Sequence, residues 1–282
     1  MVLDKEFPSD PRVENEAKML INEGHELYLL CLKNNKFDYQ KFKNIKLEYI
    51  TKSELWVKRG RPLIGNLWDY YTISWAKFIK KFIKQNDIEI LHVHDLYMAP
   101  AAIKVKHKMG IPIILDLHEN YPAAIKSYNW ATKFPKNLVV QPNKWSEREK
   151  KYLSEIDGII VLSEYFKNQL ISKYNFLNNN RFIVYPNLPS LAEFSAYNID
   201  NNILDTSSKF TLFYFGAIAE RRGIFTCFEA LKKLVDHIPE ILLLLIGPVD
   251  LADREQFSRY LENEKIKHNI IHYNWKDIKY LP

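Results

Sequence analysis

The residues best able to do chemistry gather in two short polar clusters. Residues 92–95 read His-Val-His-Asp and end an apolar run that begins at Ile88, while residues 116–119 read Asp-Leu-His-Glu and end a run that begins at Ile111. Both runs are typical of buried strands, and α/β proteins place functional side chains just past the carboxyl ends of strands. Because ionisable side chains are costly to bury unless a ligand or partner satisfies them, we expect a functional role for at least one cluster.

Taken alone, the first cluster also suits a metal site. His92 and His94 stand two residues apart in a strand, so their side chains point to the same side and could both reach one zinc ion, with Asp95 and His118 nearby. A metal-bound water would then act as the nucleophile of a metal-dependent hydrolase. The alternative for His92, and for His107, is a histidine held by backbone hydrogen bonds.

A third candidate site begins after the apolar run 210–215. Gly216 ends this run, Arg221 and Arg222 lie in a short loop, and a helix is expected from about Gly223. A helix N-terminus offers backbone N–H groups and positive potential, and guanidinium groups bind phosphate in a bidentate manner. The segment therefore indicates an anion site, or else an exposed and solvated arginine pair.

Composition excludes several classes of protein. The chain has 282 residues, of which 47% are hydrophobic and 26% charged, as in an ordinary globular protein of two domains. Its apolar runs are far shorter than the ~20 residues of a membrane-spanning helix. The eight glycines form neither a dinucleotide fingerprint nor a phosphate loop. Cys31 and Cys227 are widely separated and are predicted to be buried free thiols.

These candidate residues need strands and helices to position them. Asp10 and Pro11 are typical of a helix start, and Gly24 ends that helix. Further helices are predicted at 67–85, 99–109, 146–156, 164–173, 223–236 and 253–264. Strands are predicted at 25–32, 45–50, 88–93, 111–117, 158–162, 182–185, 210–215, 241–246 and 270–273. The alternation of helices with continuous apolar strands predicts a doubly wound α/β fold.

The same alternation predicts the domain organisation. We expect an N-terminal domain over residues 1–187, a linker rich in Pro, Asn, Ser and Asp over 188–208, and a second domain over 209–282. Three strands make a thin α/β domain with an open edge, so the second domain is expected to be incomplete.

Basic charge is concentrated in the first domain. Residues 1–185 hold 29 of the 40 Lys and Arg but 21 of the 34 Asp and Glu. Within it, residues 68–84 interleave lysines with aromatic residues on one predicted helix. Such a helix can lie on an anionic membrane surface or meet a phosphorylated lipid, but the favoured interpretation is a core-facing helix with a solvated lysine face. No nucleic-acid-binding module is recognisable, so we expect no nucleic-acid partner.

Read in order, several segments resemble a GT-B glycosyltransferase of the retaining family-4 type. The resemblance begins with Asp-Pro-Arg-Val at 10–13 and covers nearly the whole chain. The other matching segments are 14–17, 24–26, 92–95, 113–122, 157–163, 185–187, 214–223 and 243–248.

The resemblance implies two Rossmann-like domains with the active site between them. It implies that the first takes the acceptor and the second binds a UDP- or GDP-linked sugar, without a cofactor or metal. His118 is the implied catalytic residue, reaching the transferred sugar. The implied donor-binding residues are Gly216, Arg221, Arg222 and Gly223, with Arg222 on the donor diphosphate. The implied acceptor-side or cleft residues are Asp10, Arg12, His94, Asp95, Glu119 and Asn187.

The sequence departs from the family pattern at three places. Residues 7–12 replace a glycine-rich turn, so Arg12 or the helix N-terminus is expected to meet the ligand there. Ala217 stands where the family usually has an arginine, and Arg221 is the expected substitute. The acidic motif that holds the donor sugar would lie beyond Pro282, so we expect the 282-residue chain to have little or no activity.

The function implied is that of a retaining, hexosyltransferase-type enzyme that uses a nucleotide sugar. Its acceptor is expected to be a glycan or lipid-linked molecule in polysaccharide or glycolipid assembly. We expect a cytoplasmic protein, with peripheral attachment to the inner face of the membrane as an open alternative. Two other functions stay open, namely the metal-dependent hydrolase based on His92, His94, Asp95 and His118, and a non-catalytic nucleotide-sugar-binding protein.

Overall fold

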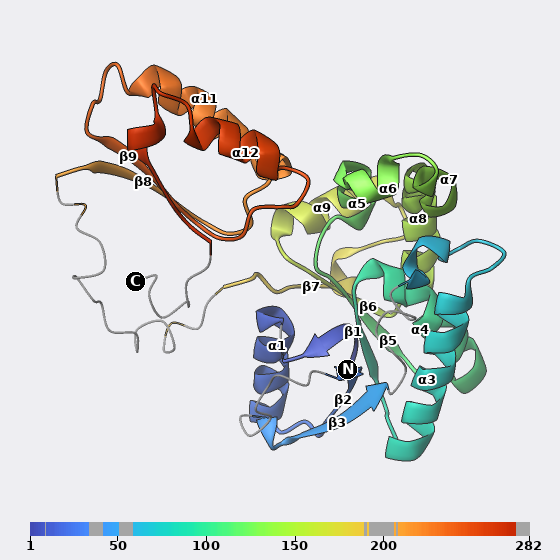
Figure 1. Cartoon of the computed structure of the whole chain (residues 1–282). Helices are drawn as coiled ribbons and strands as arrows, with labels where there is room; N and C mark the ends of the chain where they lie inside the picture. Colours follow the sequence, from blue (N-terminus) through green and yellow to red (C-terminus); the bar gives the residue numbers. More distant parts are fainter. Residues whose placement is uncertain are drawn as a thin grey trace. The chain divides into compact units, whose positions relative to one another are not determined.

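The computed structural model describes residues 1–8, 10–33, 42–50, 59–188, 191, 206 and 208–274. The chain divides into two compact units, Met1–Asn187 and Leu188–Pro282, here called the N-terminal and C-terminal units (Figure 1). Only residues 188, 191, 206 and 208 of the predicted linker are among those described, so the linker lies largely outside them. Among the described residues, no helix combines the length and apolarity needed to cross a bilayer.

The N-terminal unit is built on one parallel sheet. In the described residues the strand order is β3-β2-β1-β4-β5-β6-β7, so the chain extends the sheet in one direction from β1 and then in the other from β4. The strands are β1 (Val2–Phe7), β2 (Leu27–Lys33), β3 (Ile45–Ile50), β4 (Leu91–His94), β5 (Ile113–Leu117), β6 (Gly158–Val161) and β7 (Phe182–Val184). Because the order reverses between β1 and β4, their carboxyl ends mark the topological switch point where α/β sheets bind ligands.

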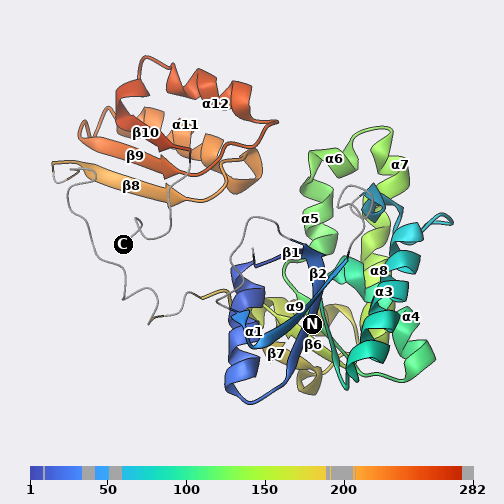
Figure 2. The same ribbon diagram turned by 60° about the horizontal axis from the view of Figure 1, so that its bottom comes forward.

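Helices cover both faces of this sheet (Figures 1 and 2). Side chains of β1 alternate between faces: Leu3 and Phe7 pack with Val13 of helix α1 (Pro11–Asn22), whereas Val2 packs with Trp75 of helix α3 (Tyr70–Asn86). The other described helices of this unit, apart from short 3-10 turns, are α4 (Ala99–Met109), α5 (Tyr121–Ser127), α6 (Asn129–Thr132), α7 (Lys136–Val140), α8 (Trp145–Glu155) and α9 (Glu164–Lys173).

Helix α3 carries the lysine and aromatic residues of 68–84 except Trp68, which precedes the helix and is exposed. Its apolar stripe, including Trp75, Ile79 and Phe82, is buried, and Lys77, Lys81 and Lys84 are exposed. The core-facing interpretation of this helix is therefore confirmed.

The C-terminal unit has a smaller sheet. Its described strands are β8 (Phe210–Phe215), β9 (Ile241–Ile246) and β10 (Ile270–Tyr273), parallel and in the order β10-β9-β8. Helices α11 (Ile224–Leu234) and α12 (Arg254–Leu261) lie together on one face of this sheet (Figure 2). Phe228 of α11 and Phe257 of α12 have ring centroids 5.7 Å apart and close a separate core over β9.

Most predicted elements lie where expected. Strand β1 was not predicted, because Asp4, Lys5 and Glu6 interrupt its apolar run. Strand β4 begins at Leu91 rather than at 88, because its ladder with β5 starts at the pair Leu91–Ile113 and Ile90 is already exposed. Helices α5, α6 and α7 were not predicted, since they are too short to show a helical period. The prediction of two buried thiols is wrong for Cys227, which is exposed on α11, whereas Cys31 is buried in β2.

Candidate active site

Parallel strand register brings the two predicted polar clusters together. His94 of β4 pairs with Asp116 of β5, and β1 lies on the other side of β4. The polar segment after each strand therefore reaches the same edge of the sheet, where α1 begins with Asp10 as its N-cap. The site stands at the switch point between β1 and β4, as the doubly wound topology requires.

An ion pair between Arg12 and Asp116 forms the centre of the site. Arg12 Nε donates to Asp116 Oδ2 at 2.7 Å and Arg12 Nη2 donates to Asp116 Oδ1 at 2.6 Å, a bidentate geometry in which both side chains are buried. Arg12 Nη1 also donates to the carbonyl oxygen of Tyr185 and to Oδ1 of Asn187, at 2.6 and 3.0 Å. One arginine thus joins α1, β5 and the segment that follows β7.

His118 lies on the solvent side of this ion pair, with a side chain that is 11% exposed. Its Nε2 is 2.8 Å from Asp116 Oδ2, and its Nδ1 faces Asp10 and Asp95 at 3.7 and 3.8 Å. Burial alone would lower the pKa of His118, but the hydrogen bond with Asp116 and the charges of Asp95 and Asp10 outweigh it and raise that pKa. His118 is therefore suited to present a charged N–H group to a ligand.

Asp95 has an unusual backbone conformation. Its φ of 70° is in a region that residues other than glycine rarely adopt, and such residues gather at functional sites. Tyr97 Oη donates to Asp95 Oδ2 at 2.6 Å, and Lys5 Nζ lies 3.5 Å from Asp95 and 3.1 Å from Asp10. Burial opposes ionisation of Asp95, yet the charges of His118 and Lys5 lower its pKa. Two carboxylates and two cations therefore alternate around the mouth of the site.

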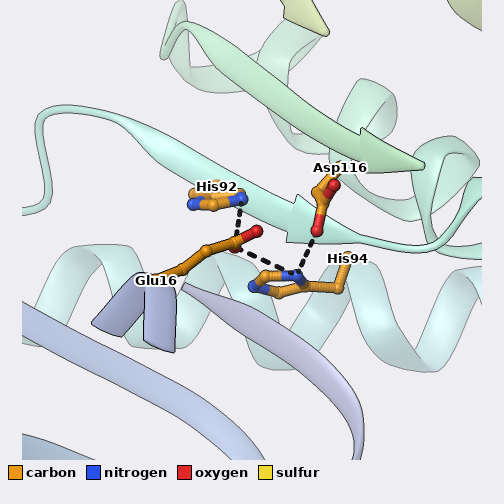
Figure 3. A group of neighbouring side chains, drawn as sticks. All are labelled: Glu16, His92, His94 and Asp116. Carbon is orange, nitrogen blue, oxygen red and sulfur yellow. Dashed lines mark hydrogen bonds and ion pairs between the residues drawn. The ribbon is translucent and has the colours of Figure 1, made fainter. Parts of the chain in front are cut away.

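A second layer of ionisable side chains lies beneath Asp116 (Figure 3). Glu16 Oε2 is 3.5 Å from His92 Nε2 and 3.9 Å from His94 Nδ1, and His94 Nδ1 is 3.3 Å from Asp116 Oδ2. Burial and the charge of Asp116 raise the pKa of Glu16 to about 9, while burial lowers the pKa of both histidines. At neutral pH this layer therefore holds an uncharged carboxyl group and two uncharged imidazoles.

These four residues have the composition of a metal site, and each offers a ligand atom within 4.8 Å of the others. Their surroundings fit a metal poorly. Asp116 already accepts from Arg12 at both oxygens and from His118, and Arg12 Nε is 3.2 Å from Glu16 Oε1. A divalent cation would have to bind beside a fixed guanidinium group, which repels it. Both Glu16 carboxyl oxygens and the Nε2 atoms of His92 and His94 are nevertheless buried without a hydrogen-bond partner.

The C-terminal unit contains the predicted anion loop. After β8 the chain turns at Gly216, whose φ is 142°, and a 3-10 turn, η6 (Glu220–Arg222), ends at Gly223. Gly223 is the N-cap of α11 and supplies no side chain, so no side-chain cap closes the first turn of this helix. Arg221 and Arg222 are both exposed next to it. Backbone N–H groups and two guanidinium groups are thus brought to one end of the helix.

The structure gathers most of the predicted acceptor-side residues into one site. Those brought together are Asp10, Arg12, His94, Asp95, His118 and Asn187. Glu119 lies at the side, accepting from Tyr128 Oη at 3.1 Å. His107, which the sequence left open, lies outside the site and pairs with Glu155.

Sequence reasoning missed Lys5, Tyr97 and Glu16 as members of the site. Glu16 had a readable signal, because it stands on the face of α1 that carries Val13 and Ala17, where an apolar residue is expected. Its spacing of four residues from Arg12 places both on that buried face. No comparable signal marks Lys5 or Tyr97, which reach the site only through the fold.

Comparison with known proteins adds a family and a fold. Residues 12–188 match the family model described as Glycosyltransferase Family 4. The uncharacterized glycosyltransferase YqgM of Bacillus subtilis is 21% identical over an alignment of 218 residues, and the match covers 72% of this chain and 56% of that protein. This chain therefore spans little more than half the length of that curated relative.

Solved structures share the fold at low sequence identity. Sucrose-phosphate synthase from Thermosynechococcus elongatus aligns with a TM-score of 0.67 and 14% identity over 95% of this chain and 65% of its own. A glycosyltransferase from Rickettsia africae aligns with a TM-score of 0.61 and 13% identity, over 98% and 67%. Anabaena HepE in complex with UDP and glucose aligns with a TM-score of 0.59 and 10% identity, over 98% and 68%. The expected GT-B type of fold, with a partial second unit, is confirmed.

Proposed function

This chain belongs to Glycosyltransferase Family 4, and from that premise we propose that it serves the transfer of a hexose from a nucleotide sugar to a glycan or lipid-linked acceptor, with retention of configuration. The observation that carries the proposal is the charged site of His118, Asp116 and Arg12 at the switch point of the N-terminal unit. Its charged imidazole and ring of carboxylates suit a polar, uncharged substrate such as a sugar, whose hydroxyl groups both donate and accept hydrogen bonds.

On the donor side, we propose that the loop from Gly216 to Gly223 binds the diphosphate of a UDP- or GDP-linked sugar. Arg221, Arg222 and the N–H groups at the start of α11 supply the positive potential. When the glycosidic bond breaks, negative charge develops on the leaving diphosphate, and fixed cations stabilise that charge. The structural relative HepE was solved with UDP and glucose bound, which supports a uridine nucleotide.

On the acceptor side, His118 is the proposed catalytic residue. Its Nε2 is held by Asp116, so its Nδ1 is left to face the mouth of the site with Asp10 and Asp95. We assign Arg12 and Asn187 a structural role at the base of the site rather than a role in ligand binding, because Arg12 donates a hydrogen bond to Asn187. The proposal includes no cofactor and no metal, and it assumes a location in the cytoplasm or at the inner face of the membrane.

Transfer by the full gene product tests the proposal. With UDP- and GDP-sugars and membrane glycolipids as substrates, His118→Ala is expected to lower turnover roughly 100-fold or more, and Arg222→Ala by a similar factor. His25→Ala and Arg259→Ala are the matched controls, because both side chains are exposed and lie outside the site. Full turnover in both site variants would overturn the assignment.

Two other functions remain as alternatives to transfer. A metal-dependent hydrolase is favoured by the closely spaced ligand atoms of Glu16, His92, His94 and Asp116, some of which lack a hydrogen-bond partner. This set contains His92 and His94 of the predicted ligands but replaces Asp95 and His118 by Glu16 and Asp116. Stoichiometric zinc in the purified protein, lost in His92→Ala, would support that function over transfer. A non-catalytic nucleotide-sugar-binding protein would bind UDP or GDP through Arg222 and show no turnover with any acceptor.

A further inference from the structure

Four large apolar side chains on the N-terminal unit project into solvent. Leu67 is 100% exposed, Trp68 80%, Phe134 79% and Leu138 63%. We call these four residues the apolar patch. A single exposed apolar side chain needs no explanation, but a group of large ones marks an interaction surface.

The two segments that carry the patch lie side by side. Asn66 Nδ2 donates to the carbonyl oxygen of Val139 at 2.7 Å, which joins the segment before α3 to helix α7. Both views show the chain before α3 next to α7 (Figures 1 and 2). Leu67 and Trp68 from one segment and Leu138 from the other therefore belong to one surface.

Both segments are anchored to the core. Before α3, Ile64 is buried, and Asp69 accepts from the N–H groups of Gly65 and Thr72 at 2.8 and 2.9 Å. At the end of α7, Val140 is buried and its carbonyl oxygen accepts from Trp145 Nε1 at 3.3 Å. The fold thus holds these apolar side chains in contact with water. Their exposure is unfavourable in free energy, and a binding partner that covers them would remove this penalty.

On the α7 side of the patch the charge is mostly of one sign, whereas on the other side half-buried Asp69 follows Trp68 and accepts from backbone N–H groups. Residues 120–146 contain four lysines and no Asp or Glu. All four lysines are exposed, and they are Lys126, Lys133, Lys136 and Lys144. Large apolar side chains surrounded by lysines complement a surface that is apolar inside and anionic outside.

We propose that the apolar patch docks the N-terminal unit on an anionic lipid bilayer. Trp68, Leu67, Phe134 and Leu138 enter the boundary between headgroups and acyl chains, and the lysines contact anionic headgroups. Docking on a bilayer would bring the protein to a lipid-linked acceptor, and in this respect the proposal rests on the proposed function. The segment that leads from β5 towards the patch begins beside the candidate site, since α5 starts four residues after Leu117 and Tyr128 Oη donates to Glu119.

The apolar patch is a different surface from the lysine face of α3. The aromatic residues of that helix, such as Trp75 and Phe82, are buried in the core and cannot enter a bilayer without unfolding the unit. Its lysines can add long-range attraction to anionic lipid but no apolar insertion.

Vesicle co-sedimentation of the 282-residue chain tests the proposal without donor or acceptor. Vesicles of phosphatidylcholine with 30% phosphatidylglycerol, roughly the anionic content of a charged membrane surface, are compared with pure phosphatidylcholine. We expect salt-sensitive binding to the anionic vesicles, reduced about tenfold or more by the double substitution Trp68→Ser with Leu138→Ser. Lys133→Gln with Lys136→Gln is a second variant that leaves the apolar residues intact and is expected to weaken binding several-fold.

Matched controls separate insertion from general charge. Tyr165→Ser removes an exposed aromatic side chain from α9, and Lys77→Gln with Lys81→Gln removes two exposed charges from α3. Both are expected to bind more tightly than the corresponding patch variant. Three outcomes would overturn the proposal: no vesicle binding, equal binding to neutral vesicles, or patch variants that abolish self-association of the chain in solution and leave vesicle binding unchanged. Vesicle binding is measured without substrate, so a failed transfer assay would not contradict membrane docking. Likewise, absent vesicle binding would not contradict the proposed transferase function.

Discussion

At the scale of single residues, the candidate site holds two neighbouring carboxyl groups, Asp116 and Glu16, in different protonation states. Asp116 accepts from Arg12 and His118 and is kept ionised, because these hydrogen bonds and charges lower its pKa despite burial. Glu16 lies beside it and is kept neutral, because a second buried negative charge would be repelled. The result is one charged layer at the mouth of the site and one uncharged layer beneath it.

The neutral state of Glu16 leads to a prediction about stability. The folded protein keeps this proton up to about pH 9, whereas an unfolded glutamate loses it near about pH 4.3. The unfolded state therefore binds fewer protons across this window, so Glu16 lowers the stability progressively as pH rises, by at most about 1.4 kcal/mol per pH unit. Glu16→Gln is expected to gain stability relative to the wild type at pH 8 and to lose that gain at pH 5, as measured by urea unfolding.

Glu149 provides the matched control for this experiment. It is also buried on a helix, but it accepts from Lys173 Nζ at 2.9 Å and from Tyr174 Oη at 2.7 Å. Glu149→Gln removes the charge that pairs with Lys173 and is expected to lose stability at both pH values. A Glu16→Gln variant with the same stability change at pH 5 and pH 8 would contradict a neutral Glu16.

At the scale of elements, the ends of β8 and β9 are held together by two glycines. Gly216 N donates to the carbonyl oxygen of Ile246 at 2.9 Å, and Gly247 follows with a φ of 148°. A Cβ atom at Gly247 would lie 1.9 Å from the carbonyl oxygen of Gly216, so the two backbones can approach only without a side chain there. The proposed donor loop therefore starts at a close backbone contact that requires glycine at position 247.

Substitution of Gly247 tests this close approach. Gly247→Ala is expected to lower the free energy of unfolding of the C-terminal unit by more than about 3 kcal/mol and to weaken UDP binding. Gly110→Ala is the control, because Gly110 also has a positive φ, of 71°, but has no atom within 4 Å of its would-be Cβ. That variant is expected to cost only about 1 kcal/mol. Equal losses in chemical denaturation would show that the backbone contact is unimportant.

At the scale of the whole molecule, the chain holds separate cores. Leu115 of β5 belongs to the core of the N-terminal unit, together with buried residues of α3, α4 and α8, whereas Leu245 packs with Phe228 and Phe257 in the C-terminal unit. Each unit therefore has its own apolar driving force for folding, and one free energy need not describe both.

Calorimetry of two core variants tests this independence. Leu245→Ala is expected to lower the stability of one thermal transition by about 2–5 kcal/mol, and Leu115→Ala that of the other, because each leaves a cavity in one core. The wild type is expected to show two transitions. Both transitions moving together in either variant would indicate that the two units fold as one.

The sequence by itself determined the order and type of most elements and which polar clusters follow strands. It could do so because apolar periodicity and caps such as Asp10 act within a few residues, so they can be read locally. It also supplied the family resemblance, which depends on motif order along the chain.

Only the tertiary structure decided which charges meet. Arg12 and Asp116 are 104 residues apart, and their contact depends on how α1 packs on the sheet and on the register of β4 with β5. The protonation of Glu16 was equally beyond the sequence, since burial and the nearness of Asp116 raise its pKa. Local patterns set where a side chain can point, whereas the energy of a buried charge depends on neighbours that only the folded chain brings together.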